Sequence, residues 1–269
     1  MPLFNFNLLP VLEAAYTFPP SDPSRRYYSW YGLTNGRYAI EVGDARIFQY
    51  SPEFLRLGLC RPARTPSDPL ADCDDYPVGR VWENILDILP DILVDIPGPA
   101  FDLISTVQAQ TDWLRSLAWV HGIEDDEALD QLFCATDWLG YRRLDTGYLV
   151  DGPQVWFFRF SGQIHVRWDN SKANAGTIPR WLATSGSYSL PVDLFLAELQ
   201  LFNDRLMSQV AARIEEIETQ NLLPKEHCDI EQLRLVHREL IEALSNAKRI
   251  KAHDVDWERV HAANQRLRK

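Results

Sequence analysis

The sequence predicts an α+β fold in which two β-blocks form one antiparallel sheet, with a helical insert between them and C-terminal helices. Residues 27–50 and 141–168 alternate apolar and polar side chains around turn residues, a pattern typical of strands. Residues 77–139 and 190–269 place apolar side chains three or four positions apart, as on one face of a helix. We therefore expect an α+β domain over residues 1–189, with the C-terminal helical region packed on it.

The first β-block, residues 27–50, is predicted to be a three-stranded meander. Asn35-Gly36 is a typical type I′ hairpin turn because both central residues must adopt positive φ. A second turn at residues 43–44 would place Glu41 opposite Arg46 on neighbouring strands, a favourable cross-strand pair. An isolated hairpin is marginally stable in water, so we expect this block to share a sheet with the second one.

The helical insert, residues 77–139, is expected to contain helices separated by helix-breaking residues. Pro97-Gly98-Pro99 and Gly122 mark the breaks. Pro90 lies inside the first helix, where its ring removes a backbone hydrogen bond, so we expect a kink or an interruption there. The expected helices span residues 78–94, 100–121 and 125–139.

The second β-block ends in a hairpin over residues 154–168, with Ser161-Gly162 as its two-residue turn. This turn places Trp156 opposite Arg167 and Phe158 opposite His165. Residues 185–189, "SGSYS", are then predicted to form a loop before the next helix. Pro191 suits the first position of a long helix over residues 191–219, and further helices are expected at 230–244 and 254–267.

Negative charge is concentrated in one part of the chain. Residues 72–137 contain fifteen Asp and Glu against two basic residues, Arg80 and Arg115, while the whole chain has a net charge of −11. Such a field repels nucleic acid and attracts cationic protein surfaces. No apolar run reaches the roughly 18–20 residues needed to span a bilayer. We therefore expect a basic protein partner, no nucleic acid and no membrane.

Two groups of carboxylates stand out in this segment as candidate partner-binding residues. One recurs at every fourth position of the first predicted helix, so its members share one helix face although like charges at this spacing repel. The alternative for this first group is an ordinary solvated helix face. The alternative for the second group is that Asp125 or Asp126 caps the helix that follows it. The two groups are Glu83, Asp87, Asp91 and Asp95, and Glu124, Asp125, Asp126 and Glu127.

A possible cleft is predicted around the 154–168 hairpin. His165 shares a strand face with Trp156 and Arg167, where an aromatic surrounding would tune its pKa. The alternative is an exposed sheet face on which Arg167 stacks on Trp156. Arg159 is a charged residue on the apolar face, where it could pair with a carboxylate or extend past its neighbours to solvent.

No strong catalytic or metal motif is present in the sequence. The cysteines Cys60, Cys73, Cys134 and Cys228 are scattered without a CxxC pair, so we expect unpaired thiols. The stretch "HDVDWERVH" at 253–261 combines His, Asp and Glu, and capping of the following helix accounts for it better than a metal does. No Ser or Cys stands in a nucleophile motif. We therefore expect no catalytic residue, no metal and no cofactor.

Several stretches together resemble an uncharacterised family of bacterial proteins. They are "SWYGLTNGRYAIEVG", "GYLVDGPQVWFFRFSGQIHVRWD" and "LPVDLFLAELQLFNDRLMSQVAARI". The resemblance implies a bacterial, cytosolic protein, and the first residues also lack the basic region of a signal peptide. It implies no catalytic residues. By composition alone, the chain is also similar to the acidic immunity proteins that inhibit secreted toxins.

The leading hypothesis is a non-enzymatic, cytoplasmic protein that binds a basic partner, such as a toxin, as an immunity or antitoxin-like inhibitor. Such a protein would only need to occlude a positively charged surface. The alternative is an enzyme or small-molecule sensor with a cleft at His165. A third hypothesis is a subunit of a larger assembly, which would gain support if the helix at 191–219 were apolar all round.

Overall fold

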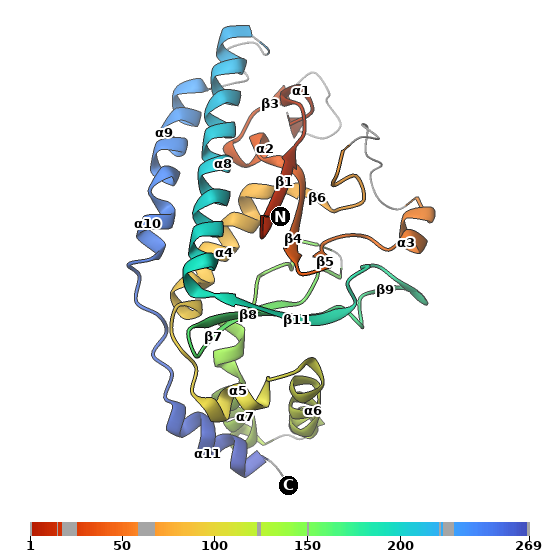
Figure 1. Ribbon diagram of the computed structural model, residues 1–269, viewed down its shortest axis with the longest axis vertical. Helices are drawn as coiled ribbons and strands as arrows, with labels where there is room; N and C mark the ends of the chain where they lie inside the picture. Colours follow the sequence, from red (N-terminus) through yellow and green to blue (C-terminus); the bar gives the residue numbers. More distant parts are fainter. Residues whose placement is uncertain are drawn as a thin grey trace.

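A three-stranded antiparallel sheet, in the order β11-β8-β7, crosses the middle of the protein and separates two layers (Figure 1). We call it the central sheet. The structure is a computed structural model that describes residues 2–14, 16–17, 26–58, 68–122, 125–149, 151–220, 222 and 229–267. The strands of the central sheet are β7 (Val155–Phe160), β8 (Gln163–Asp169) and β11 (Ser185–Pro191).

Side chains of β7 alternate between the two layers. Val155 and Phe157 belong to the upper core, whereas Trp156 and Phe158 belong to the lower one. Because both faces of this strand are covered, it is apolar at nearly every position rather than at every second one. Strand β7 is therefore covered on both sides, whereas β11 at the edge of the sheet keeps Ser185, Ser187 and Ser189 exposed.

The predicted hairpin is confirmed, including its register. Ser161 and Gly162 have φ values of 49° and 72°, as a two-residue hairpin turn requires. Strand pairing places Trp156 opposite Arg167 and Phe158 opposite His165. The turn and the alternation of the flanking residues are sufficient to determine this local structure.

Residues 185–189, predicted to form a loop, instead belong to β11. This strand pairs with β8 from Ser185↔Asp169 to Pro191↔Gln163. Gly186 is required there because a Cβ atom at its position would lie 2.3 Å from the indole of Trp168. The glycine thus makes room for a large core residue, and it does not mark a turn.

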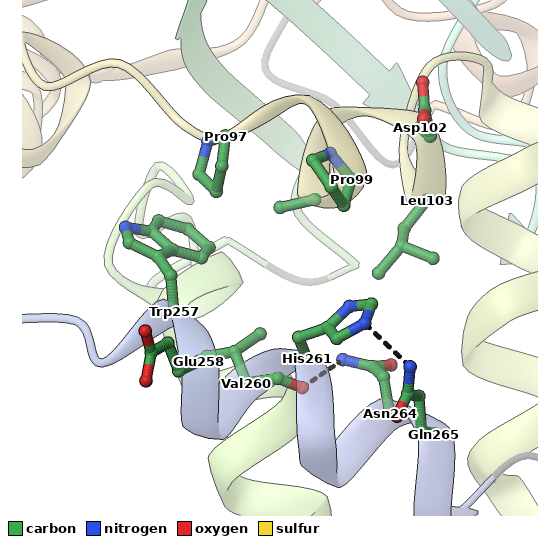
Figure 2. Close-up of a pocket in the computed structure, with 11 residues that line it drawn as sticks. Pro97, Pro99, Asp102, Leu103, Trp257, Glu258, Val260, His261, Asn264 and Gln265 are labelled. Carbon is green, nitrogen blue, oxygen red and sulfur yellow. Dashed lines mark hydrogen bonds between the residues drawn. The ribbon is translucent and has the colours of Figure 1, made fainter.

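The lower layer is helical and covers the face of the central sheet that carries Trp156 and Phe158. Helix α11 packs against α7 and lies opposite α5, with Trp257 beside Pro97 and Pro99 (Figure 2). The helix predicted over 100–121 is split, because Thr106 caps a new helix by accepting a hydrogen bond from the amide of Ala109. The elements are α5 (Gly98–Leu103), α6 (Val107–Leu117), the 3₁₀ helix η1 (Ala118–Gly122), α7 (Asp126–Gly140) and α11 (Trp257–Leu267).

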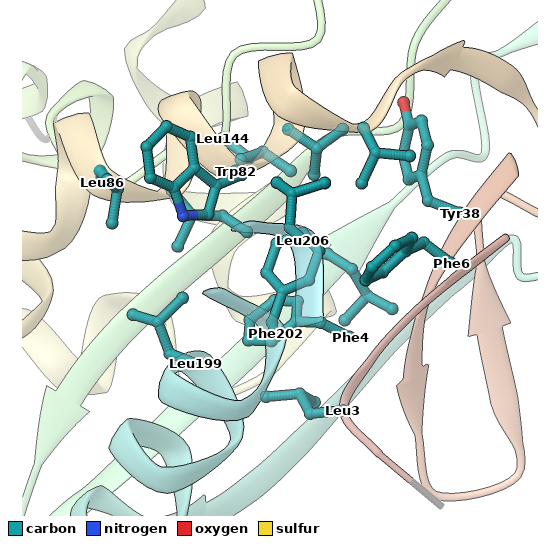
Figure 3. Packing of buried hydrophobic residues seen from close by; sticks show 14 of the residues in the cluster. Leu3, Phe4, Phe6, Tyr38, Trp82, Leu86, Leu144, Leu199, Phe202 and Leu206 are labelled. Atoms are coloured by element: carbon teal, nitrogen blue, oxygen red, sulfur yellow. The ribbon is translucent and has the colours of Figure 1, made fainter. Parts of the chain in front are cut away.

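The upper layer contains a second sheet packed against long helices. Phe202 of α8 stacks on Phe4 and meets Phe6 edge-on, with ring centroids 5.3 Å and 5.5 Å apart (Figure 3). The sheet has the order β1-β4-β5, with β6 also paired to β4. Its elements are β1 (Phe4–Leu8), β4 (Asn35–Val42), β5 (Ala45–Ile47), β6 (Asp75–Pro77), α4 (Val78–Ile92), α8 (Val192–Gln220), α9 (Ile230–Ile241) and α10 (Ala243–Ala247).

The predicted meander is only half right. The β4–β5 hairpin has the expected register, with Glu41 opposite Arg46 and a 3.0 Å ion pair between them. The first turn is wrong, because Asn35 and Gly36 lie inside β4 and the residues before them form helix α2 (Trp30–Leu33). Gly36 faces the backbone of β1, where a Cβ atom would lie 2.5 Å from a carbonyl oxygen.

The α+β fold is confirmed, but the two β-blocks do not share one sheet. Strand β4 is paired by β1, β5 and β6, and β8 by β7 and β11, so each block satisfies its own backbone groups. An isolated bridge between Tyr50 and Trp181 joins the two regions. Short elements complete the described chain: α1 (Val11–Ala14), β2 (Tyr16–Thr17), β3 (Arg26–Tyr27), α3 (Pro52–Arg56), β9 (Asn174–Ala175) and β10 (Ile178–Pro179).

Helix α8 places its buried residues on one stripe, which packs into the upper core. Phe195, Leu199 and Phe202 begin the stripe and Ile217 ends it, so the apolar surface is not distributed all round the helix. Leu194 and Leu201 of the same helix are exposed outside the stripe, and the assembly hypothesis stays a prediction. Among the described residues, no helix combines the length and apolar character needed to cross a membrane.

Candidate functional site

The carboxylates predicted on α4 are largely used within the protein. Glu83 is half-buried and accepts hydrogen bonds from the hydroxyl of Tyr31 (2.6 Å) and from Arg80 (2.7 Å). Burial, with the nearby carboxylate of Glu83, raises the pKa of Tyr31 to about 12. The charge of Glu83 is thus already compensated by its neighbours.

Asp91 is 1% exposed, so it cannot meet a partner. It accepts hydrogen bonds from the backbone amide of His253 (3.0 Å) and pairs with Nδ1 of the same residue (2.8 Å). The His253 ring stacks on Tyr141, with centroids 3.9 Å apart. The segment between α10 and α11 therefore covers this face of α4, which a helix considered alone would leave in water.

The other two members of the row, Asp87 and Asp95, are exposed. Asp95 lies beyond the end of α4 and forms a 3.2 Å ion pair with Arg159, which also donates to the carbonyl of Leu93. Asp87 is exposed, and its pKa is raised by the protein around its carboxylate, by Glu83 and by Asp145. The prediction of one exposed wall of four carboxylates on this helix is therefore wrong.

The second predicted group lies at the start of α7. Asp125 caps this helix and accepts hydrogen bonds from the amides of Glu127 (3.0 Å) and Ala128 (3.2 Å), as one of the two interpretations predicted. Asp126 and Glu127 are exposed in the first turn. Glu124 lies outside the described residues.

A hollow of about 340 Å³ lies between α7 and the start of α11, and we call it the acidic hollow. Among the described residues that line it, Arg259 is the one basic side chain. The carboxylates come from two parts of the chain more than a hundred residues apart, so the hollow forms only on folding. Its acidic residues are Asp130, Asp137, Asp254 and Asp256.

An apolar side chain accompanies the carboxylates of the acidic hollow. Phe133 lines it and is 55% exposed, which is unusual for a large hydrophobic residue within an acidic surface. Trp138 forms part of the buried base and packs on Trp257, with ring centroids 5.4 Å apart. The hollow thus combines negative charge with an exposed aromatic ring on a rigid base.

Sequence reasoning identified the acidic segment but not this hollow. A detectable signal was present, because Asp126, Asp130 and Asp137 recur at spacings of four and seven residues, which places them on one face of a helix. Asp254 and Asp256 carried no such signal. Asp256 was predicted as part of a helix cap, and it does accept a hydrogen bond from the amide of Arg259 (3.0 Å).

The profile of a family of unknown function, DUF5984, matches residues 3–263. The chain belongs to this family. The matched region includes both layers and every residue of the acidic hollow. No curated protein and no solved structure matches the chain. The predicted membership of an uncharacterised protein family is therefore confirmed.

In this DUF5984 protein, the predicted cleft at the hairpin is covered by α5. Phe101 stacks on Phe160 with centroids 4.2 Å apart and lies 4.8 Å from His165. Nδ1 of His165 is 2.9 Å from the hydroxyl of Ser189. Burial lowers the pKa of His165, and the charge of Arg167 adds to this effect.

Arg167 is 2% exposed on the same face, so the predicted exposed stack on Trp156 is wrong. Its guanidinium lies 5.7 Å from the ring centroid of Phe158, and it donates to the side chain of Gln110 at 3.4 Å. Burial lowers the pKa of Arg167 to about 10. Trp156, another of the four residues predicted for the cleft, lines a different hollow of about 600 Å³ beside Tyr141.

A mainly apolar cavity of about 590 Å³, larger than the acidic hollow, lies between α5 and α11 (Figure 2). We call it the α5–α11 cavity. It shares Val260 with the acidic hollow and otherwise uses different residues. Within the described parts of the chain, no group of three or more His, Cys, Asp or Glu side chains is arranged to hold a metal ion.

The cysteines within the described chain, Cys73 and Cys134, are free thiols. Cys60 and Cys228 lie outside the described residues. Burial raises the pKa of the Cys73 thiol to about 12, and the carboxylate of Asp72 adds to the effect. Cys73 is therefore a poor nucleophile at neutral pH, since the thiolate is the reactive form.

Proposed function

We propose that this DUF5984 protein is a non-enzymatic bacterial protein of the cytoplasm that binds a basic partner through the acidic hollow. The specific form of the proposal is an immunity or antitoxin-like inhibitor that occludes a cationic surface of a toxin. Its main support is the acidic hollow beside α7, which carboxylates line together with the exposed ring of Phe133. The surface on α4 that the sequence suggested is not part of this proposal.

The composition of the hollow favours a basic protein segment as the occupant. Asp130, Asp137, Asp254 and Asp256 together outweigh Arg259 in the lining and Lys251, which lies 3.9 Å from Asp254. Asp126 and Glu127 extend the negative surface along α7. Complementary charge accelerates encounter and makes association depend on salt.

Phe133 would supply the apolar contact that charge alone does not provide. Aromatic side chains dominate the binding energy of many interfaces when a partner buries them. The stem of an Arg or Lys is apolar up to its charged end. A basic side chain could therefore lie along Phe133 while its charge reaches Asp130 or Asp137.

We do not propose catalysis at the hairpin. Phe101 covers His165, and Arg167 is buried between the central sheet and α6. A substrate would have to displace helices of the lower layer to reach Arg167, whereas His165 is half-buried beside Phe101. On the face that was considered as a cleft, Trp156, Phe158 and Arg167 are buried in the lower layer.

The test is a binding titration against the purified protein products of the adjacent genes, each produced as a catalytically inactive variant. We expect one basic product to bind, and its affinity to fall by at least about tenfold between 0.05 M and 0.3 M salt, as for charge-steered complexes. The triple variant Asp126→Lys, Asp130→Lys and Asp137→Lys should reduce binding by at least about a hundredfold.

The matched control reverses the same number of exposed charges elsewhere. Glu215→Lys, Glu239→Lys and Glu242→Lys change the net charge equally, on helices α8 and α9 and at the residue that follows α9. This control should weaken binding by less than about threefold, since distant surface charges are screened. Equal weakening by both triple variants, or no binding by any adjacent product, would refute the proposal.

A further inference from the structure

Strand β11 forms one edge of the central sheet, and no strand of the described chain pairs with its outer side. The opposite edge, at β7, is covered, because the amides of Ile96 and Leu144 donate to the carbonyls of Arg159 and Val155. An open strand edge presents backbone donors and acceptors that can pair with another chain. The two edges of the central sheet therefore differ, and only the one at β11 is open to a further strand.

Alternate residues of β11 direct their backbone groups outward. The carbonyl of Thr184 accepts a hydrogen bond from the amide of Asn170, on the β8 side of the strand. Hydrogen-bonded and non-hydrogen-bonded pairs alternate in an antiparallel ladder, so the even-numbered residues of β11 bond to β8 and the odd-numbered ones face away. The outward groups belong to Ser185, Ser187 and Ser189, which are all exposed. No backbone hydrogen bond from another described segment reaches them.

The outer edge of β11 carries none of the features that keep most edge strands from pairing. Natural proteins protect such edges with charged side chains, bulges or proline. The strand reads SGSYSLP, without a charged residue and with Pro191 only at its last position. Its register with β8 runs without a bulge from end to end. The edge is therefore continuous and uncharged over the three outward serines.

A second copy of this chain fits the edge best in one antiparallel register. With a two-fold axis at Ser187, this residue pairs with its own equivalent and Ser185 pairs with Ser189 of the other copy, so all outward groups form hydrogen bonds, about six in total. Moving the axis to Ser189 would bring in Pro191, which has no amide hydrogen. Moving it to Ser185 would bring in Trp181, which already forms a bridge within the chain.

The side chains are compatible with the same register. It places Tyr188 of one copy opposite Gly186 of the other, in a non-hydrogen-bonded pair where side chains approach closely. A Cβ atom at Gly186 would lie 2.3 Å from the indole of Trp168, so Tyr188 would meet this indole. An aromatic ring across from an edge glycine stabilises strand pairing. On the opposite face only small, uncharged serine side chains meet.

We infer that two copies of this protein associate through β11 and join their central sheets into one continuous antiparallel sheet. Such a contact is isologous, because the same residues are used on both sides of a two-fold axis. A peptide strand from another protein would be read by side-chain pockets beside the edge, and the hollows described above are not lined by β11. The inference goes beyond the proposed function, since the acidic hollow uses other residues.

Sedimentation of the full chain between about 10 µM and about 500 µM tests the association, because a contact limited to strand edges is weak. We expect the mass to rise from monomer towards dimer with concentration. Each copy has a net charge of −11, and salt screens their repulsion. The dimer should therefore strengthen by at least about threefold between 0.05 M and 0.5 M salt, whereas binding of the basic partner should weaken.

Amide hydrogen exchange, followed by NMR, locates the contact without any substitution. The amides of Ser185, Ser187 and Ser189 should exchange at least about threefold more slowly at the highest concentration than at the lowest, because pairing protects them. The amides of Gly186 and Tyr188, which bond to β8, should be protected at every concentration.

A charge at the axis should separate the two copies. Ser187→Glu places two carboxylates directly opposite each other and should weaken the dimer by at least about tenfold. The control Ser245→Glu adds the same charge at an exposed position of α10 and should weaken it by less than about threefold. Urea unfolding of both variants checks that each remains folded, as expected for exposed side chains.

Cysteine cross-linking tests the register. In Ser187→Cys the two new thiols would lie on residues with Cα atoms about 5.5 Å apart, within reach of a disulfide. In Ser189→Cys the equivalent residues would be more than about 10 Å apart. Mass spectrometry should find the linked peptide in the first variant and not in the second.

Three outcomes would overturn the inference. One is a monomer at every concentration in 0.5 M salt. Another is a dimer that Ser187→Glu does not weaken or that leaves the three outward amides unprotected. The third is protection that appears only when the basic partner is added, which would assign the edge to a strand of that partner. Because the dimer and the partner complex respond to salt in opposite directions, failure of one proposal is distinguishable from failure of the other.

Discussion

Helices α4 and α7 are both fifteen residues long and rich in carboxylates, yet the protein uses these charges differently. Eleven residues of α4 are buried, against five of α7. The upper core and the segment before α11 cover most of α4, so its charges are paired, buried or close to one another. Helix α7 lies at the edge of the lower layer and keeps several of its carboxylates in water. Position in the fold, rather than charge spacing, decides which helix can meet a partner.

The largest expected effect is at Asp91. Asp91→Ala removes a buried acceptor of two contacts with His253 and should lower the free energy of unfolding by about 3 kcal/mol. The matched change on α7, Asp130→Ala, should alter it by less than about 0.5 kcal/mol because the residue is exposed. Urea unfolding of both variants gives the comparison, and equal losses would show that α4 and α7 do not differ in this way.

The next largest effect is expected at His253, the partner of Asp91 in this contact. His253→Ala removes the Nδ1 contact with Asp91 and the stacking on Tyr141. We expect a loss of about 1–2 kcal/mol, less than for Asp91 because the backbone amide of residue 253 still donates. A double-mutant cycle with Asp91→Ala should show a coupling energy of at least about 0.5 kcal/mol. Additive losses would contradict the assigned contact.

One carboxylate at the start of α7 is structural, which sharpens the contrast within that helix. Asp125→Ala removes the cap of α7 and should cost about 1 kcal/mol of stability. Asp126→Ala, one residue further on, should have an effect below about 0.5 kcal/mol. Thermal unfolding of the two variants measures the difference, and the reverse order would mean that the cap is assigned to the wrong residue.

The smallest effect is at Asp87, and it should be stabilising. The pKa of Asp87 is raised above its ordinary value of 3.8 by its surroundings and by Glu83, so its ionised form disfavours the folded state at neutral pH. Asp87→Asn should therefore increase stability at pH 7 by a few tenths of a kcal/mol, roughly the cost of one like-charge pair on a helix.

The pH dependence provides the control for this last variant. At a pH below the ordinary pKa of aspartate, about 3.8, Asp87 is protonated in both the folded and unfolded states, so the gain should disappear. As the pH rises through the raised pKa, the gain should return. Unfolding curves at about pH 3 and pH 7 test this, and a gain that does not depend on pH would point to packing rather than charge.

Local rules predicted the β7–β8 hairpin, the β4–β5 hairpin and several of the longer helices correctly. The Ser161-Gly162 turn and its register follow from the conformational needs of two residues. The α4 and α7 helices follow from apolar spacing, and Asp125 from its capping chemistry. Each of these features depends on residues close together in the chain, so the sequence was sufficient.

The local rules failed where a distant segment decided the outcome. Gly36 and Gly186 resembled turn residues, but each lies in a strand where a neighbouring backbone or the indole of Trp168 leaves no room for a Cβ atom. The predicted turn would have paired β4 with the residues just before it in the chain. In the structure β4 pairs with β1 instead. Such close approaches cannot be recognised without knowing which segments pack together.

The sequence by itself determined the α+β class, the central hairpin and the concentration of negative charge in one segment. Only the tertiary structure decided where that charge is accessible. It buried Asp91 beneath His253, a residue 162 positions away, and brought Asp254 and Asp256 beside Asp130 and Asp137. Exposure depends on what packs against a helix, and the identity of that neighbour is a property of the whole fold.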